Sequence, residues 1–243
     1  MSGTQADDDR DIVLVHTSDL HVDDGHKANA HDGTEGLRSV LATAQSVGAD
    51  ILLLAGDTFD NHRVPAPILR RAAAMLEAAG LPVVILPGNH DPALPNCLFR
   101  KAGITDLPNV RVLGITHPDS VQFDALDLEI WGHAHRDYND MTPLRAPRPR
   151  TTRWQVAMAH GHYAAPAEWQ EHAHRSWLIS DQHLAATQAH YVALGHWDRA
   201  VSVGDGSVPA YYSGSPELAK TVNVVRLSPT EGVVIRREPV AWS

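Results

Sequence analysis

Cysteine and basic residues are scarce in this 243-residue sequence, and long apolar runs are absent from it. The single cysteine, Cys97, excludes an intrachain disulfide and suits a reducing compartment; we interpret it as a small buried apolar residue. Lysine and arginine total 20 against 29 acidic residues, so the formal net charge is -9, which opposes tight, indiscriminate binding to nucleic acid. No apolar stretch approaches the roughly 20 residues of a membrane-spanning helix.

The amino-terminal segment is polar and acidic and has no apolar core of the kind found in signal peptides. We therefore predict that residues 1–10 form a disordered acidic leader. We also predict a cytoplasmic protein without membrane association. Residues 11–243, in a chain with 43% hydrophobic content, suit a single α/β domain with a full core.

Three short apolar segments each end at a cluster of polar residues. Segment 12–16 leads into Asp19 and His21, segment 51–55 into Gly56 and Asp57, and segment 83–86 into Gly88-Asn89-His90-Asp91. Helical patterns at 35–47 and 68–79 separate these segments, which predicts parallel strands joined by crossover helices. Ligands bind at the carboxyl ends of such strands. Asp, His and Asn side chains gathered there predict a metal site or an acid/base site.

The second half of the chain is rich in strand patterns. We predict strands at 110–113, 126–131, 154–159, 191–194, 211–213, 222–227 and 233–236, and one convincing helix at 181–188. Residues 141–152, with three prolines and three arginines, predict a solvated basic loop. Two packed sheets with helices outside accommodate both halves of the chain. The predicted fold is therefore a four-layer α/β/β/α sandwich of two mixed sheets.

Two further predicted strands end at histidines. Segment 154–159 runs into His160-Gly161-His162, and segment 191–194 runs into Gly195-His196-Trp197-Asp198. In chain order, the motifs are Asp19-x-His21, Gly56-Asp57-x-x-Asp60, Gly88-Asn89-His90-Asp91, His160 and Gly195-His196-x-Asp198. This ordered series resembles the calcineurin-like metallophosphoesterase superfamily. The wording of the motifs is most similar to the SbcD-type DNA-repair exonuclease branch.

Members of that branch generally carry a capping domain after the phosphoesterase core. Only about thirty residues follow Ser213 in this sequence, so we expect no cap. The resemblance therefore supports the chemistry better than it supports DNA as the substrate.

Cleavage of a phosphate ester requires a nucleophile, neutralisation of phosphoryl charge and protonation of the leaving group. Two metal ions about 3.5–4 Å apart supply the first two by activating a water and clamping the reacting oxygens. One ligand must bridge them, and a carboxylate can do so whereas an imidazole cannot; we assign Asp57. The resemblance implies Asp19, His21, Asp57 and Asp198 for the first ion, and Asp57, Asn89, His160 and His196 for the second.

Mixed oxygen and nitrogen ligands favour two divalent ions such as Mn, with Fe or Zn as alternatives. The superfamily's final motif usually reads Gly-His-x-His, so Asp198 replaces its second histidine. The extra negative charge of Asp198 favours harder metals such as Mn or Fe. The alternative is that the replacement weakens binding of the first metal ion. His133 and His135 spell the usual final motif but precede His160, and we interpret them as a surface or substrate-side feature.

The resemblance implies that His90 is a histidine outside the ligand set that stabilises the transition state and protonates the leaving oxygen. Asp91 and Asp60 are predicted to orient imidazoles. His162 and Trp197 are candidates for substrate binding; Trp197 either stacks on a base or aryl group or packs beside its strand. Residues 163–177 form either a lid or an exposed loop.

The favoured function is a metal-dependent phosphoric ester hydrolase of nuclease-like, phosphodiesterase type. The alternative is a phosphatase or phosphodiesterase acting on a small metabolite or nucleotide. A third reading is a partner-binding scaffold without activity, against which the retention of His90 and the ligand positions argues. Any contact with nucleic acid would not use a basic surface, and an ATPase partner is implied by analogy alone.

Overall fold

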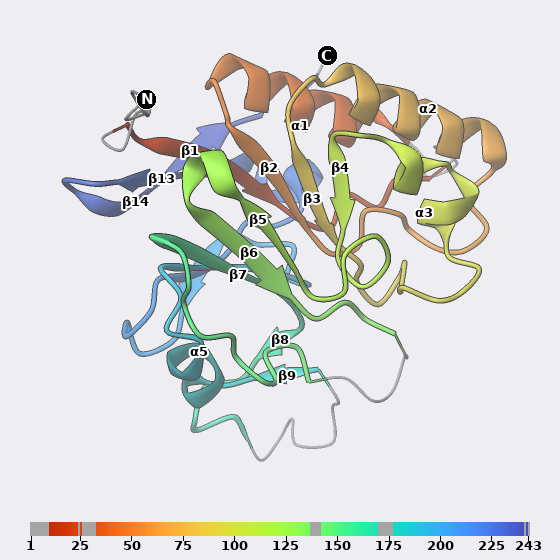
Figure 1. Cartoon of the computed structure of the whole chain (residues 1–243). Coiled ribbons are helices and arrows are strands. Elements are labelled where there is room, and N and C mark those ends of the chain that lie inside the picture. Colours follow the sequence, from red (N-terminus) through yellow and green to blue (C-terminus); the bar gives the residue numbers. More distant parts are fainter. Residues whose placement is uncertain are drawn as a thin grey trace.

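Two six-stranded mixed sheets form the centre of the protein in its computed structural model, which describes residues 10–23, 25, 33–136, 142–169, 177–240 and 242 (Figure 1). The first sheet has the order β14 (Gly232–Pro239), β13 (Thr221–Ser228), β1 (Ile12–Thr17), β2 (Ile51–Ala55), β3 (Val83–Leu86) and β4 (Val110–Val112). The second has the order β11 (Val201–Val203), β12 (Ala210–Tyr212), β10 (Tyr191–Gly195), β7 (Trp154–His160), β6 (Leu128–Gly132) and β5 (Ser120–Phe123). A small additional sheet pairs β8 (His162–Tyr163) with β9 (Leu178–Ile179).

The central strands of both sheets are parallel. Strands β1 to β4 run parallel to one another, and helices α1 (Glu35–Ser46) and α2 (Ala66–Ala78) form the first two crossovers. In the second sheet, β10 runs parallel to both β7 and β12, and β6 is parallel to β7. Parallel strands place their carboxyl ends at one edge, so the polar residues that follow them are brought together.

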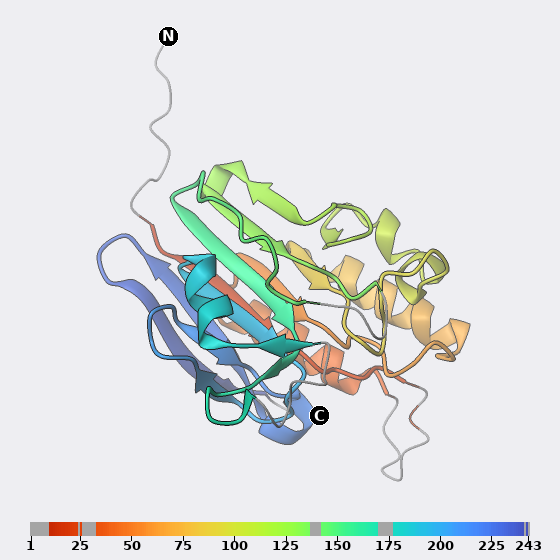
Figure 2. The same ribbon diagram turned by 90° about the horizontal axis from the view of Figure 1, so that it is seen from below.

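Three apolar clusters separate the layers of the sandwich. On β2, Leu52 and Leu54 pack in the cluster that includes α1 and α2, whereas Leu53 points into a second cluster between the two sheets. Burial on both faces explains why this strand is a continuous apolar run. A third cluster lies on the far side of the second sheet and includes Leu184 of α5 (Asp181–Thr187). Figure 1 shows α1 and α2 on one side of the two sheets and α5 on the other, which confirms the predicted four-layer fold, and Figure 2 views the same stack from below with α5 in front.

Two edge strands, β5 and β11, were absent from the strand prediction. Each is short, and only Val121 of β5 is buried, so neither carries a clear alternating pattern. The strand predicted at 126–131 begins instead at Leu128, because residues 124–126 form a 3₁₀ turn that ends with Asp127 at φ 44°. Other short helical segments are α3 (Leu98–Lys101), a 3₁₀ turn at Ile104–Asp106 and α6 (Pro216–Ala219).

Parts of three other predictions fall outside the described residues. Of the predicted leader 1–10, only Arg10 is described, and its guanidinium donates to the Asp50 carboxylate at 3.0 Å. The described part of the basic loop, 142–152, contains no helix or strand. Residues 170–176 of the predicted lid or loop are not described. Among the helices that the structure does describe, none combines the length and hydropathy required to cross a bilayer.

Candidate metal centre

The carboxyl ends of strands from both sheets meet at one place. Asp19 and His21 follow β1, Asp57 follows β2, His160 ends β7 and His196 follows β10. The potential ligand atoms of Asp19, His21 and Asp57 lie within 4.8 Å of one another, and so do those of Asp57, His160 and His196. Asp57 belongs to both groups, which is the arrangement expected of a bridging carboxylate between two ions.

Several of these residues have left-handed backbone conformations. The φ angles are 54° at Asp19, 46° at His21, 52° at Asp57 and 106° at His196. Such conformations cost about 1–3 kcal/mol each and persist only where the surroundings impose them. Here the Asp19 and His21 amides donate to the carbonyls of Gly56 and Asp57 at 3.0 and 3.1 Å. These hydrogen bonds hold the turn from Asp19 to His21 against the loop after β2.

His160 is held in one orientation by three acceptors. Its Nδ1 donates to the Ala55 carbonyl at 2.9 Å, while Nε2 lies 3.1 Å from Asp57 Oδ2 and 3.0 Å from Asn89 Oδ1. Burial lowers the pKa of His160, but the charge of Asp57 and its hydrogen bond outweigh this and raise it to about 9. Burial raises the pKa of Asp57, and the His160 charge and hydrogen bond outweigh it, so the net pKa is lowered. A carbonyl on Nδ1 is the usual support of a metal-ligating imidazole.

Further buried groups make this region favourable for cations. Burial, with the charge of Asp57 adding to it, raises the pKa of Asp19 to about 6. Burial and the charge of His160 lower the pKa of His196 to about 3, so its imidazole is neutral and able to ligate. His21 Nδ1 is buried without a hydrogen bond, 3.4 Å from Asp60 Oδ1. This set of carboxylate, amide and imidazole donors fits a pair of divalent cations.

Two glycines allow the sheets to approach closely here. A Cβ on Gly56, where φ is 95°, would lie 1.9 Å from His160 Nδ1. A Cβ on Gly195 would lie 1.8 Å from the Ala55 carbonyl oxygen. Neither position has room for a side chain, which explains why glycine precedes Asp57 and His196 in their motifs.

His90 lies beside the cluster with its side chain 43% exposed. Its backbone amide donates to Asp57 Oδ1 at 2.9 Å, and its Nδ1 donates to the Asp60 carbonyl at 2.6 Å. The second ring nitrogen, Nε2, lies 4.0 Å from Asp57 Oδ2. His90 thus supports Asp57 through its backbone and presents one ring nitrogen toward the same side of the site.

Asp91 corrects one of our predictions. It does not orient an imidazole; its carboxylate accepts from the backbone amides of Gly88 at 2.7 Å and Phe59 at 3.0 Å. Burial, with the charge of Asp57 adding to it, raises the pKa of Asp91 to about 7. Asp91 therefore joins the loops after β2 and β3. Asp60, in contrast, does flank imidazoles, those of His21 and His90.

The family model described as calcineurin-like phosphoesterase matches residues 12–199, which is most of the chain. The chain belongs to the calcineurin-like phosphoesterase family. Its members use divalent metal ions, so the protein is a metal-dependent phosphoesterase, and the clustered Asp and His residues are its candidate ligands.

Curated relatives of this phosphoesterase include the D subunit of nuclease SbcCD. The Bacillus subtilis protein is 23% identical over 90% of this chain and 67% of its own length. The Escherichia coli protein is 25% identical over 84% of this chain and 60% of its own length. A solved structure from Thermus thermophilus covers 94% of this chain and 99% of its own with a TM-score of 0.61 at 12% identity. A second solved structure has a TM-score of 0.60 at 14% identity.

Asp198 of the phosphoesterase lies apart from the close ligand groups. This residue is exposed and lines a depression of about 360 Å³ together with His21, Asp60 and His90. Asn89, the remaining predicted ligand, contacts the cluster through His160. The structure thus brings six of the seven predicted ligands together and leaves Asp198 on the rim of the same depression.

His135 is more closely tied to the phosphoesterase site than we predicted. It is fully buried, its Nε2 donates to the His160 carbonyl at 2.8 Å, and the two rings are 5.5 Å apart. His133 is also buried, and its Nε2 donates to the Arg145 carbonyl. Of the two alternatives, the surface feature is therefore wrong, and the substrate-side feature stays a prediction. The available signal was their position directly after β6, the strand next to β7.

Trp197 and His162 form a polar and aromatic cluster next to His196. The Trp197 indole N–H donates to His162 Nδ1 at 3.1 Å, and the ring of His162 is 6.4 Å from that of His196. Trp197 stacks on Tyr212 at 4.4 Å, with an interplanar angle of 12°, and the Arg199 guanidinium lies 4.8 Å from the indole centre. The Trp197 indole therefore packs against Tyr212 and Arg199.

Proposed function

We propose that this chain is a dinuclear-metal-dependent phosphodiesterase with nuclease-like specificity. The observation that carries the proposal is that Asp57 belongs to two close groups of ligand atoms, one with Asp19 and His21 and one with His160 and His196. Asn89 completes the second set and Asp198 is assigned to the first. The pair of ions, with Mn preferred for this donor set, supplies charge neutralisation and a nucleophile when bound.

The side chains around the ligands have separate tasks in this proposal. His90 has Nδ1 committed to the Asp60 carbonyl, which leaves Nε2 to stabilise phosphoryl charge and hand a proton to the leaving oxygen. Since the Trp197 indole can only donate, His162 Nδ1 is an acceptor and its Nε2 carries the proton. His162 is assigned to contact the substrate, with Trp197 fixing its ring.

Nuclease-like specificity rests on the relatives, which are named as a subunit of nuclease SbcCD. A partner subunit with ATPase activity is part of this proposal by analogy. Hydrolysis of a small phosphorylated metabolite or nucleotide is the second candidate. It is favoured by the net charge of -9, which repels long polyanions. Location in the cytoplasm stays a prediction.

The test is to assay the Mn²⁺-loaded protein on linear single- and double-stranded DNA beside bis-aryl and mono-aryl phosphates. Degradation of DNA and the aryl diester is expected, and cleavage of the aryl substrates without DNA would favour the second candidate. Elemental analysis is expected to give two metal ions per chain. Asp57→Ala should lose both ions and activity, whereas Asp205→Ala, in an exposed loop, should retain them. A fully active Asp57→Ala protein would refute the proposal.

A further inference from the structure

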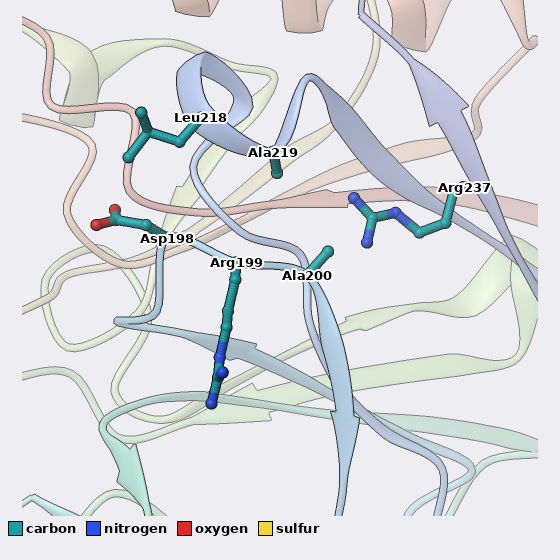
Figure 3. Close-up of a pocket in the computed structure, with 6 residues that line it drawn as sticks. All are labelled: Asp198, Arg199, Ala200, Leu218, Ala219 and Arg237. Atoms are coloured by element: carbon teal, nitrogen blue, oxygen red, sulfur yellow. The ribbon is translucent and has the colours of Figure 1, made fainter.

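A second depression adjoins the one at the metal centre. It measures about 400 Å³ and is lined by Asp198, Arg199, Ala200, Leu218, Ala219 and Arg237 (Figure 3). Asp198 and Leu218 also line the depression that contains His21 and His90, so the two form neighbouring parts of one surface. A substrate whose scissile phosphate lies at the ligands would extend into this second depression.

Arg237 points its guanidinium into the depression, at the opposite end from Asp198 (Figure 3). It lies on β14 opposite Asn223, a fully buried residue of β13. Its one hydrogen bond among the described residues is long, 3.5 Å to the Ser213 carbonyl, and no described carboxylate forms an ion pair with it. Its neighbour Arg236, in contrast, is paired with Glu238.

Among the residues that the structure describes, Arg237 has no carboxylate counter-ion. The residue is exposed overall, and burial of part of its guanidinium lowers the pKa. A charge in this position gains from an anionic partner more than a fully solvated one does. A planar guanidinium has several N–H donors and matches the oxygens of a phosphate group. Small side chains at Ala200 and Ala219 leave the space in front of it open.

The guanidinium is also linked to the metal centre through two serines. Ser213, whose carbonyl accepts from Arg237, has its hydroxyl 3.1 Å from that of Ser18, the residue before Asp19. Between the two sites stands Leu218, which is 65% exposed and is the one exposed large hydrophobic residue in the described part of the chain. An apolar surface between a metal centre and a cation suits the sugar or base that separates two phosphates.

We propose that Arg237 binds a second phosphate group of the substrate, next to the phosphodiester that is cleaved, with Leu218 contacting the sugar or base between them. The proposal rests on the proposed phosphodiesterase function and narrows it to substrates with at least two phosphate groups. The class of ligand is a phosphorylated dinucleotide or a longer oligonucleotide. Asp198, which the proposed function assigns to the first metal ion, lines the end of the depression next to the metal centre.

The experiment compares three dinucleotides that share one scissile diester: TpT, pTpT with a 5′ phosphate, and TpTp with a 3′ phosphate. In the Mn²⁺-loaded wild type, kcat/KM for one of the phosphorylated dinucleotides should exceed that for TpT on the order of 10- to 100-fold. In Arg237→Gln this ratio should fall to near one, with an unchanged Tm, and Arg237→Lys should be intermediate. Arg236→Gln, one residue away and already ion-paired, is the matched control and should keep the wild-type ratio.

Binding without catalysis separates this inference from the proposed function. Metal-free protein in chelator is titrated calorimetrically with the same dinucleotides, and Arg237→Gln should lose the tighter binding of the phosphorylated one. If the wild type cleaves neither a dinucleotide nor DNA nor the aryl diester, the proposed function fails, and the calorimetric comparison alone decides on Arg237. A ratio that survives in Arg237→Gln, an equal loss in Arg236→Gln, or equal affinities of the wild type for all three dinucleotides would overturn the assignment.

Discussion

Metal binding to this protein should release a proton from His160. In the metal-free state both ring nitrogens face acceptors, the Ala55 carbonyl on one side and Asp57 with Asn89 on the other, so the imidazole is held in its charged form. Its pKa is raised to about 9 by the charge and hydrogen bond of Asp57, which outweigh burial. A metal ion requires the neutral ring. At pH 7, about two units lower, the bound proton reduces the apparent affinity on the order of 100-fold.

The assay is calorimetric titration of metal-free protein with Mn²⁺ in buffers of different ionisation enthalpy. Between pH 7 and 8, the dependence of the heat on the buffer should correspond to about one proton released, and the affinity should rise about tenfold per pH unit. Near pH 6 a further fraction of a proton should come from Asp19, whose pKa burial raises to about 6.

Two variants test whether the proton released on Mn²⁺ binding comes from His160. His160→Gln removes this titrating group, so its weaker Mn²⁺ binding should lose the tenfold rise in affinity per pH unit between pH 7 and 8. His117→Gln, in a surface turn with its ring nitrogen near Thr116, is the control and should release the same proton as the wild type. Tight Mn²⁺ binding with no proton released at pH 7 would refute the charged state of His160 or its role as a ligand.

Three further predictions use the same geometry. Because the folded-state pKa of His160 lies above its unfolded value of 6.5, its stabilising effect is complete below pH 6.5 and is lost toward pH 9; the Tm of metal-free protein should fall over that range. Replacing His90 with Ala should lower kcat roughly 10²- to 10⁴-fold with the metal content kept, since the backbone amide still supports Asp57; unchanged kcat would contradict its role. Gly56→Ala places a Cβ 1.9 Å from His160 Nδ1, so elemental analysis of this variant should find no bound metal. The control is Gly206→Ala, at φ 86° with nothing within 4 Å, which should keep the metal and cost only about 1 kcal/mol of unfolding free energy. Equal metal content in the two variants would show that His160 tolerates displacement.

The sequence was most informative where strands are buried on both faces. The run from Ile51 to Ala55 is apolar throughout because helices cover one side and the second sheet the other. Its parallel neighbours end at the same edge, so the polar residues after each strand could be predicted to meet. Six of the seven predicted ligands do meet, since their positions follow from strand order alone.

Features that depend on contacts between distant segments could not be read from the sequence. The left-handed conformations of Asp19 and His21 are imposed by hydrogen bonds to the loop after β2. The partners of Asp91 are backbone amides, which carry no side-chain signal. The burial of His135 against His160 depends on the pairing of β6 with β7, two segments separated by a loop.

The candidate ligands of the metal centre come from both sheets: Asp19, His21, Asp57 and Asn89 follow strands of the first, whereas His160 ends and His196 follows a strand of the second. A bound pair of metal ions would therefore join the two sheets. Motion of one sheet relative to the other would separate the ligands and release the ions. Amide hydrogen exchange at the tips of β2 and β10 should accordingly slow in concert when Mn²⁺ is added, even though the two strands belong to different sheets.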